Sequence, residues 1–95
     1  MKFLMIIVDE SKKEELEVLL NRVGVEGYTE IPRVVGVGTT GPRLGSRAFP
    51  KTSALIFTVL SESTLETLLS TLREFCRECG EKLKLVSWDV NEVKL

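Results

Sequence analysis

The sequence predicts an α+β fold in which a four-stranded antiparallel sheet carries two helices on one face, in the order βαββαβ. Three observations lead to this prediction. Four apolar stretches have the composition of strands, and two segments between them repeat leucine at the spacing of an amphipathic helix. Glycine follows each of these two segments, as it does at many helix ends.

The first strand is expected over residues 2–8, where apolar side chains occupy both faces. A helix should follow, with Ser11 as its N-cap and Glu14 as the partner in a capping box. Gly24 is suited to end this helix in the left-handed conformation. The apolar stripe of the helix consists of Leu16, Leu19, Leu20 and Val23.

A second helix is expected over residues 63–79, with Ser63 as N-cap and Gly80 at its end. Pro32 cannot donate a hydrogen bond, so the strand that carries it should lie at an edge of the sheet. The remaining strands are predicted over residues 28–37, 52–60 and 83–90. With right-handed crossovers these elements give the ferredoxin-like arrangement, as one domain over residues 1–95.

The strands over 2–8 and 52–60 are apolar on both faces, and the last strand is nearly so. Two helices cover only one face of a four-stranded sheet, and an antiparallel sheet with a solvated face normally alternates polar and apolar residues. Another copy of the chain is the simplest cover for the second face. The pattern therefore predicts a homo-oligomer.

Composition indicates a globular protein, because 43% of the residues are hydrophobic, 28% are charged and the net charge is −1. This charge balance does not indicate nucleic-acid binding. No apolar run is long enough to span a membrane, and no signal peptide is recognisable, so we expect no membrane insertion and a cytoplasmic location. The absence of histidine and of a nucleophile–base pair argues against an enzyme.

The segment from Tyr28 to Lys51 contains all three prolines and four of the seven glycines. Four basic residues and one acidic residue give residues 28–52 a charge of +3, while the rest of the chain carries −4. Its middle, about residues 38–50, is expected to be a functional loop with an anion site. Gly36, Gly38 and Gly41 have the spacing of a dinucleotide-binding loop, but no helix follows them.

Arg33, Arg43 and Arg47 can bind phosphate or carboxylate with two parallel hydrogen bonds, or they can be solvated loop arginines. Cys76 and Cys79 form a C-x-x-C pair that extends the apolar stripe of the second helix. At a helix C-terminus the dipole raises the pKa of a thiol, so apolar packing is favoured over a redox or metal role.

The residues from Gly24 to Gly38 read GVEGYTEIPRVVGVG, and Pro50-Lys51 stands just before an apolar strand. The chain thereby resembles the P-II nitrogen-regulatory signalling proteins. In these, a G-x-x-G-x-T turn leads into a strand that ends in G-x-G, and a long loop ends in Pro-Lys. The similarity extends over the whole chain, although the loop is several residues shorter than in the family. The matching residues are Gly24, Gly27, Thr29, Gly36, Gly38, Pro50 and Lys51.

The resemblance implies a homotrimer with inward-facing sheets and a small anionic ligand, ATP or ADP, in the cleft between subunits, with no required cofactor. By position, Thr29 would lie near the adenine base, and Lys51 would contact an anionic effector. Lys82 matches a lysine in the family's second phosphate-binding turn, which here reads Cys79-Gly80-Glu81-Lys82. The backbone at Gly36, Val37 and Gly38 would approach the phosphates.

The resulting hypothesis is a nitrogen-regulatory type of signalling protein in which ligand binding orders the loop over residues 38–50. The ordered loop would engage or release a partner protein, since ligand contacts offset the entropy of fixing a glycine-rich segment. The alternative is a trimeric metal-ion-binding protein that resembles the CutA family and uses Cys76 and Cys79.

Overall fold

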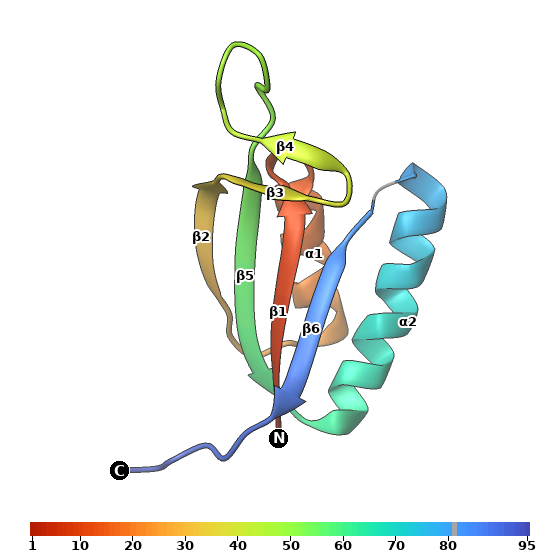
Figure 1. The fold of residues 1–95 in the computed structure, drawn as a ribbon. Helices are drawn as coiled ribbons and strands as arrows, with labels where there is room; N and C mark the ends of the chain where they lie inside the picture. The colour runs from red at the N-terminus through yellow and green to blue at the C-terminus, as the bar shows by residue number, and fades with distance from the viewer. Residues whose placement is uncertain (81) are drawn as a thin grey trace.

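The computed structural model describes residues 1–80 and 82–95, and in it four antiparallel strands form one sheet (Figure 1). The strand order is β2-β5-β1-β6, which is the ferredoxin-like order, so the predicted fold class is confirmed. Glu81, in the turn before the last strand, lies outside the described residues. The bounds are β1, Lys2–Asp9; β2, Thr29–Val34; β5, Ser53–Leu60; and β6, Lys84–Asp89.

The strand predicted over residues 28–37 is divided in the structure. β2 is an edge strand, as Pro32 predicts, and its register with β5 shifts between Ile31 and Val34. Arg33, directly after the proline, has a φ of 58°, a conformation that a non-glycine residue rarely adopts. The proline removes a donor and Arg33 turns the backbone, so pairing with β5 ends at Val34. A separate strand, β3 (Gly36–Gly38), begins two residues later.

The first helix, α1, runs over Lys13–Val23 and is preceded by a short 3₁₀ turn, η1 (Glu10–Lys12). The prediction of Ser11 as N-cap is wrong. The Asp9 carboxylate accepts hydrogen bonds from the Ser11 N–H at 3.1 Å and from its hydroxyl at 3.2 Å, so Ser11 is itself capped. Gly24 ends α1 with a φ of 91°, as predicted.

The second helix, α2, runs over Glu62–Cys79. Its N-cap is Ser61 and not the predicted Ser63, because the Ser61 hydroxyl accepts a hydrogen bond from the Thr64 N–H at 3.2 Å. Gly80 ends the helix with a φ of 68°, as predicted. No helix in the described ranges is long and apolar enough to cross a membrane.

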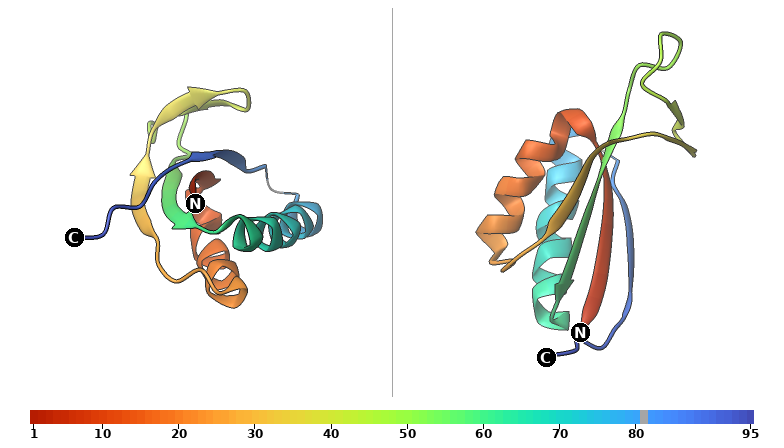
Figure 2. Two further views of the ribbon diagram at one scale, coloured as in Figure 1. Left: turned by 90° about the horizontal axis from the view of Figure 1, so that it is seen from below. Right: turned by 90° about the vertical axis from the view of Figure 1, so that its left-hand side faces the viewer.

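Both helices pack on one face of the sheet (Figure 2), and alternate residues of β1 and β5 point into this core. The helices contribute leucines from the predicted stripes. The most deeply buried core side chains are Leu4, Ile6, Val8, Leu16, Leu20, Ile56, Leu68 and Leu72.

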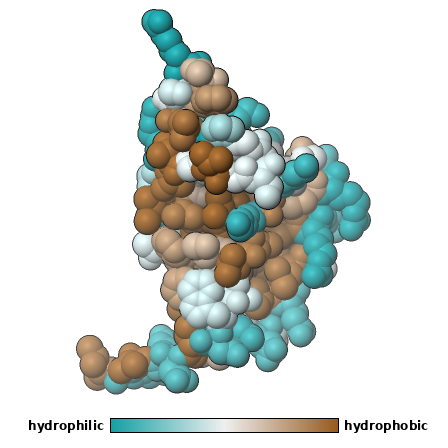
Figure 3. Space-filling model, in the orientation of Figure 1, coloured by the Kyte–Doolittle hydropathy of each residue, from teal (hydrophilic) through white to brown (hydrophobic). Residues whose placement is uncertain are grey.

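The opposite face of the sheet, called the open face below, is apolar and partly exposed (Figure 3). Trp88 is 43% exposed and stacks on Phe3 at a centroid distance of 4.7 Å. Apolar side chains thus occupy both faces of the central strands, as predicted from the sequence. The apolar side chains of the open face are Phe3, Met5, Ile7, Ile31, Leu55, Phe57, Val59, Val86 and Trp88.

The predicted loop begins as a small hairpin. β3 pairs with β4 (Gly41–Arg43), and Gly41 has a φ of 105°, which glycine adopts without strain. Figure 2 shows that this hairpin extends over the side of the sheet that carries no helices. The chain then projects beyond the sheet as a second loop before it enters β5 (Figure 1), and residues 44–51 are called the outer loop below.

Candidate functional site

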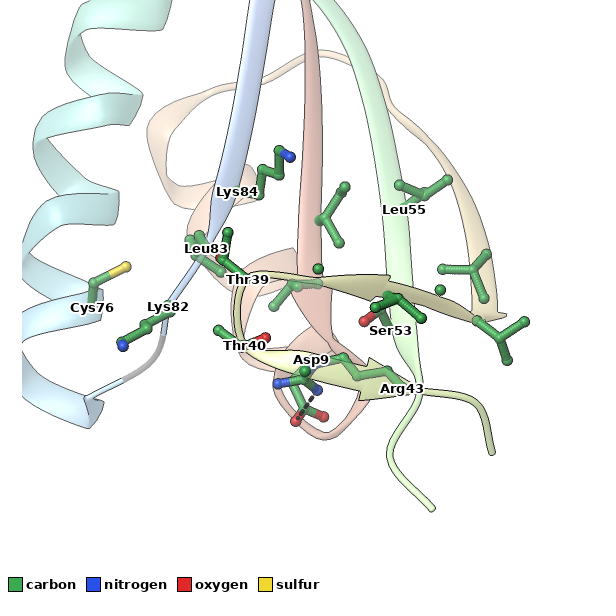
Figure 4. A pocket seen from close by; sticks show the side chains of 18 residues that line it. Asp9, Thr39, Thr40, Arg43, Ser53, Leu55, Cys76, Lys82, Leu83 and Lys84 are labelled. Atoms are coloured by element: carbon green, nitrogen blue, oxygen red, sulfur yellow. Dashed lines mark hydrogen bonds and ion pairs between the residues drawn. The ribbon is translucent and has the colours of Figure 1, made fainter. Parts of the chain in front are cut away.

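A cleft of about 710 Å³ lies between the β3–β4 hairpin and the adjacent end of the open face (Figure 4). The hairpin contributes a glycine-rich backbone and the two threonines of its turn. The sheet contributes the ends of β1, β5 and β6 that lie beneath the hairpin. The polar side chains that line the cleft are Asp9, Thr39, Thr40, Arg43, Ser53, Cys76, Lys82 and Lys84.

The polar groups of the sheet lie at one end of the open face. Alternation along each strand places Asp9 on the same face as Ile7, Ser53 on the same face as Leu55, and Lys84 on the same face as Val86. Asp9 is opposite Ser53 in the strand register. The open face is therefore apolar over most of its length, and Asp9, Ser53 and Lys84 make it polar where it forms the floor of the cleft.

Arg43, at the end of β4, forms an ion pair with Asp9, at the end of β1. The Arg43 guanidinium donates to the Asp9 carboxylate at 2.9 Å, and the two side chains are 24% and 15% exposed. Burial by itself raises the pKa of Asp9, but hydrogen bonds from Arg43 and Ser11 outweigh it and hold this pKa below its ordinary value. The carboxylate is therefore charged at neutral pH and neutralises Arg43.

The neighbouring Glu10 contacts the other end of the outer loop. The Thr52 hydroxyl donates to the Glu10 carboxylate, and the Glu10 N–H donates to the Thr52 carbonyl at 3.1 Å. Arg43 precedes the outer loop and Thr52 follows it. Two consecutive acidic residues, Asp9 and Glu10, thus hold the two ends of this loop.

Five of the eight predicted ligand-binding residues line this cleft: Gly36, Val37, Gly38, Arg43 and Lys82. The other three do not. Thr29 is an exposed residue of β2 paired with Phe57, and Arg47 and Lys51 are exposed in the outer loop. Sequence reasoning overlooked Asp9, Thr39, Thr40, Ser53 and Lys84. Asp9 and Lys84 could have been found from the sequence. Each is two positions from an apolar residue of its strand, Ile7 and Val86, and alternation therefore places it on the same face of the sheet.

The two lysines of the cleft are placed differently from Arg43. Neither Lys82 nor Lys84 is ion-paired with any residue in the described part of the chain. Figure 4 shows that Lys82, in the segment before β6, and Lys84, at the start of β6, lie on the other side of the cleft from the ion pair. No described carboxylate neutralises either lysine, so both are available to an anion at this side of the cleft.

Of the two cysteines, only Cys76 lines the cleft. Cys79 is exposed, and its thiol donates to the Phe75 carbonyl at 2.9 Å. Within residues 1–80 and 82–95, no group of three or more cysteine or acidic side chains is arranged to hold a metal ion.

The fold is that of the P-II-like proteins, since solved structures of this class match it over 94–96% of the chain. The family model for nitrogen regulatory protein P-II matches residues 1–94, so the chain belongs to the P-II family. This match also decides between the two family resemblances considered from the sequence. The comparison with curated proteins gives no match.

Two similar solved structures are of CPII, a nitrogen regulatory PII-like protein from Thiomonas intermedia. One is bound to ADP, AMP and bicarbonate, with 26% identity and a TM-score of 0.73 over 96% of this chain and 88% of CPII. The other is bound to ADP and bicarbonate, with the same identity and coverage and a TM-score of 0.72. A putative PII-like signaling protein from Thermus thermophilus is 19% identical, with a TM-score of 0.72 over 94% of this chain and 85% of that protein, and supports the fold alone.

Proposed function

We propose that this P-II family protein is a homotrimeric regulator that binds an adenine nucleotide in a cleft between subunits. Binding changes the conformation of the loop over residues 38–50, and this loop contacts a partner protein. The protein acts by binding and not by catalysis, in the cytoplasm. No bound cofactor is needed for the fold or for signalling.

The observation that carries this proposal is the meeting of two distant segments at one cleft. Gly36, Val37 and Gly38 lie on the hairpin and Lys82 lies before β6, yet all four line the same space. The resemblance to P-II proteins assigned both segments to phosphate binding. Glycine lets a ligand approach the backbone closely, and an ammonium group attracts the phosphate charge.

The open face supports the trimer. A contiguous apolar surface on a sheet face marks an interaction site, and a second copy of the same chain offers a matching apolar face. The cleft lies at the end of this face. Packing of three copies through their open faces would therefore bring residues of a neighbouring subunit to the cleft. An intersubunit site also gives a role to Thr29, Arg47 and Lys51, which do not line the cleft of a single subunit.

The ligands of the relatives support the choice of nucleotide. The CPII structures are described with ADP, AMP and bicarbonate. By analogy, ADP is the first ligand to test for this chain, and bicarbonate is the first small anion to test with it.

Calorimetric titration with ATP, ADP and AMP, each with and without bicarbonate, tests the proposal. We expect micromolar binding of at least one nucleotide, weakened about tenfold or more by Lys82→Ala, because a hydrogen bond to a charged group contributes roughly 1.5–3 kcal/mol. Arg22→Ala is the matched control, since Arg22 is an exposed cation at the C-terminal end of α1 and does not line the cleft.

Absence of nucleotide binding in the unmodified protein would reject the nucleotide as ligand. Equal losses in Lys82→Ala and Arg22→Ala would place the nucleotide outside this cleft. An outer loop whose amide hydrogen exchange does not respond to saturating ligand would reject the proposed role of the loop in signalling.

A further inference from the structure

The Asp9–Arg43 ion pair occupies the position in which an anionic ligand would meet Arg43. Arg43 lines the cleft, and so does Asp9, whose carboxylate is 2.9 Å from the Arg43 guanidinium. The cleft thus contains a negative group of its own beside its only arginine among the described residues. A ligand anion must either share Arg43 with this carboxylate or replace it.

The same ion pair is connected to the outer loop. Arg43 is the last residue before this loop, and the loop is closed on itself by backbone hydrogen bonds. The Leu44 N–H donates to the Phe49 carbonyl at 3.3 Å, and the Gly45 N–H donates to the Lys51 carbonyl at 3.2 Å. Arg43 directly precedes Leu44, whose N–H makes the first of these hydrogen bonds. Loss of the ion pair with Asp9 therefore removes a side-chain restraint from the residue next to the loop.

The other end of the outer loop stays anchored when Arg43 moves. Thr52 contacts Glu10 through its side chain and its backbone, and neither contact involves Arg43. The η1 turn that carries Glu10 also keeps its cap when the ion pair opens, since Ser11 donates to the other Asp9 oxygen. The contact that holds the first end of the loop, between Arg43 and Asp9, can thus be replaced by a ligand contact. The contacts that hold the second end, between Thr52 and Glu10, remain.

We propose that Asp9 is an internal competitor for Arg43, so that an anionic group bound in the cleft takes Arg43 from Asp9 and thereby releases the first end of the outer loop. This inference rests on the proposed function and specifies how ligand occupancy is passed to the loop. Asp9 is then a residue that sets ligand affinity through Arg43 without contacting the ligand. The chemical class of ligand is an anion that binds a guanidinium more strongly than a single carboxylate does, such as a diphosphate.

The test is a double-mutant cycle on ligand affinity, measured calorimetrically with ADP and with inorganic pyrophosphate. Asp9→Asn keeps an oxygen for the Ser11 N–H and removes the competing charge, so affinity should rise about tenfold. Arg43→Ala should weaken binding, and in its background Asp9→Asn should have almost no effect, because Asp9 acts through Arg43.

Glu14→Gln is the matched control. It removes one negative charge at the same end of the molecule, from an exposed residue in the first turn of α1 that does not line the cleft. Its effect on affinity should stay within about twofold, as expected for an exposed charge screened by salt. A gain that is equal for Asp9→Asn and Glu14→Gln, or that persists without Arg43, would overturn the proposal by reducing it to a general charge effect.

Amide hydrogen exchange gives a readout that does not depend on nucleotide binding. In the ligand-free protein, Asp9→Asn should raise the exchange rates of Leu44 and Gly45 severalfold while exchange in β1 and β5 stays unchanged. Unchanged rates at both amides would overturn the link to the loop. If ADP fails to bind but pyrophosphate and exchange behave as expected, the nucleotide assignment fails and the competition at Arg43 stands.

Discussion

Glu30 is a largely buried carboxylate on the helix side of β2, and its surroundings give the clearest pH-dependent prediction at the scale of one residue. Its carboxylate lies 3.4 Å from the Lys13 Nζ, which is also 3.5 Å from the Glu17 carboxylate. A hydrogen bond shared with Glu17, burial and the Glu17 charge together raise the pKa of Glu30, while the same hydrogen bond lowers the pKa of Glu17. The Glu17–Glu30 pair therefore binds its first proton more tightly in the folded protein than in the unfolded chain.

A raised carboxyl pKa contributes stability that is fully present below the unfolded value and is lost as pH rises through the folded value. Glu30→Gln keeps a hydrogen-bond donor for Glu17 without needing a proton. We expect the Tm of this variant, relative to the unmodified protein, to increase from pH 4 to pH 7. Thermal unfolding at fixed protein concentration measures it, with the exposed Glu26→Gln as control. A Tm difference that is constant over this range would contradict the shared proton.

At the scale of the element, the start of α2 offers a test of its N-cap, which is Ser61 in the structure and Ser63 in the sequence-based prediction. Ser61 accepts from the Thr64 N–H at 3.2 Å and donates to the Thr64 hydroxyl at 2.9 Å, whereas Ser63 contacts only the Ser61 hydroxyl with its own side chain in the described structure. Both serines have the same residue type and lie two positions apart. They therefore form a matched pair for substitution.

We expect Ser61→Ala to lower the free energy of unfolding by about 1 kcal/mol, the usual contribution of an N-cap. Ser63→Ala should change it by less than about 0.5 kcal/mol, as is usual for surface substitutions. Urea unfolding of both variants at the same protein concentration checks this. The reverse order of effects would move the cap to Ser63.

At the scale of the whole molecule, the open face determines the proposed assembly. Val86 lies on this face and is 36% exposed, whereas Val18 lies on α1, away from the sheet, and is 56% exposed. Burial of apolar surface contributes about 25 cal/mol per Å², so a charge placed within a packed open face should be strongly unfavourable. Substitution of Val86 therefore tests the open face, and substitution of Val18 tests the exposed side of α1.

We expect the unmodified protein to sediment as a trimer and Val86→Glu to shift it to the monomer at micromolar concentration. Val18→Glu should remain trimeric, because this residue would stay in solvent. Sedimentation velocity with circular dichroism, to verify folding, provides the measurement. A monomeric unmodified protein, or dissociation of Val18→Glu alone, would reject the assembly through the open face.

Local sequence signals predicted the elements of this protein well, because each depends on a few neighbouring residues. The leucine spacing of α1 and α2, the apolar strands, and Gly24 and Gly80 at the helix ends were all readable from the chain. The capping serines were misassigned. Each first helical turn begins one or two residues earlier than predicted, so Asp9 caps η1 and Ser61 caps α2. Residue types alone do not reveal which of several nearby side-chain oxygens lies at the start of a turn.

The sequence by itself determined the ferredoxin-like order, the apolar nature of both sheet faces and a glycine-rich basic segment before β5, since these follow from periodicity and composition. Only the tertiary structure decided which residues meet at the cleft. Asp9 and Arg43 are 34 positions apart in the chain, and the pairing of β1 with β5 together with the β3–β4 hairpin brings them to 2.9 Å. Contacts of this kind depend on strand register and hairpin position, which arise from the packing of the whole chain.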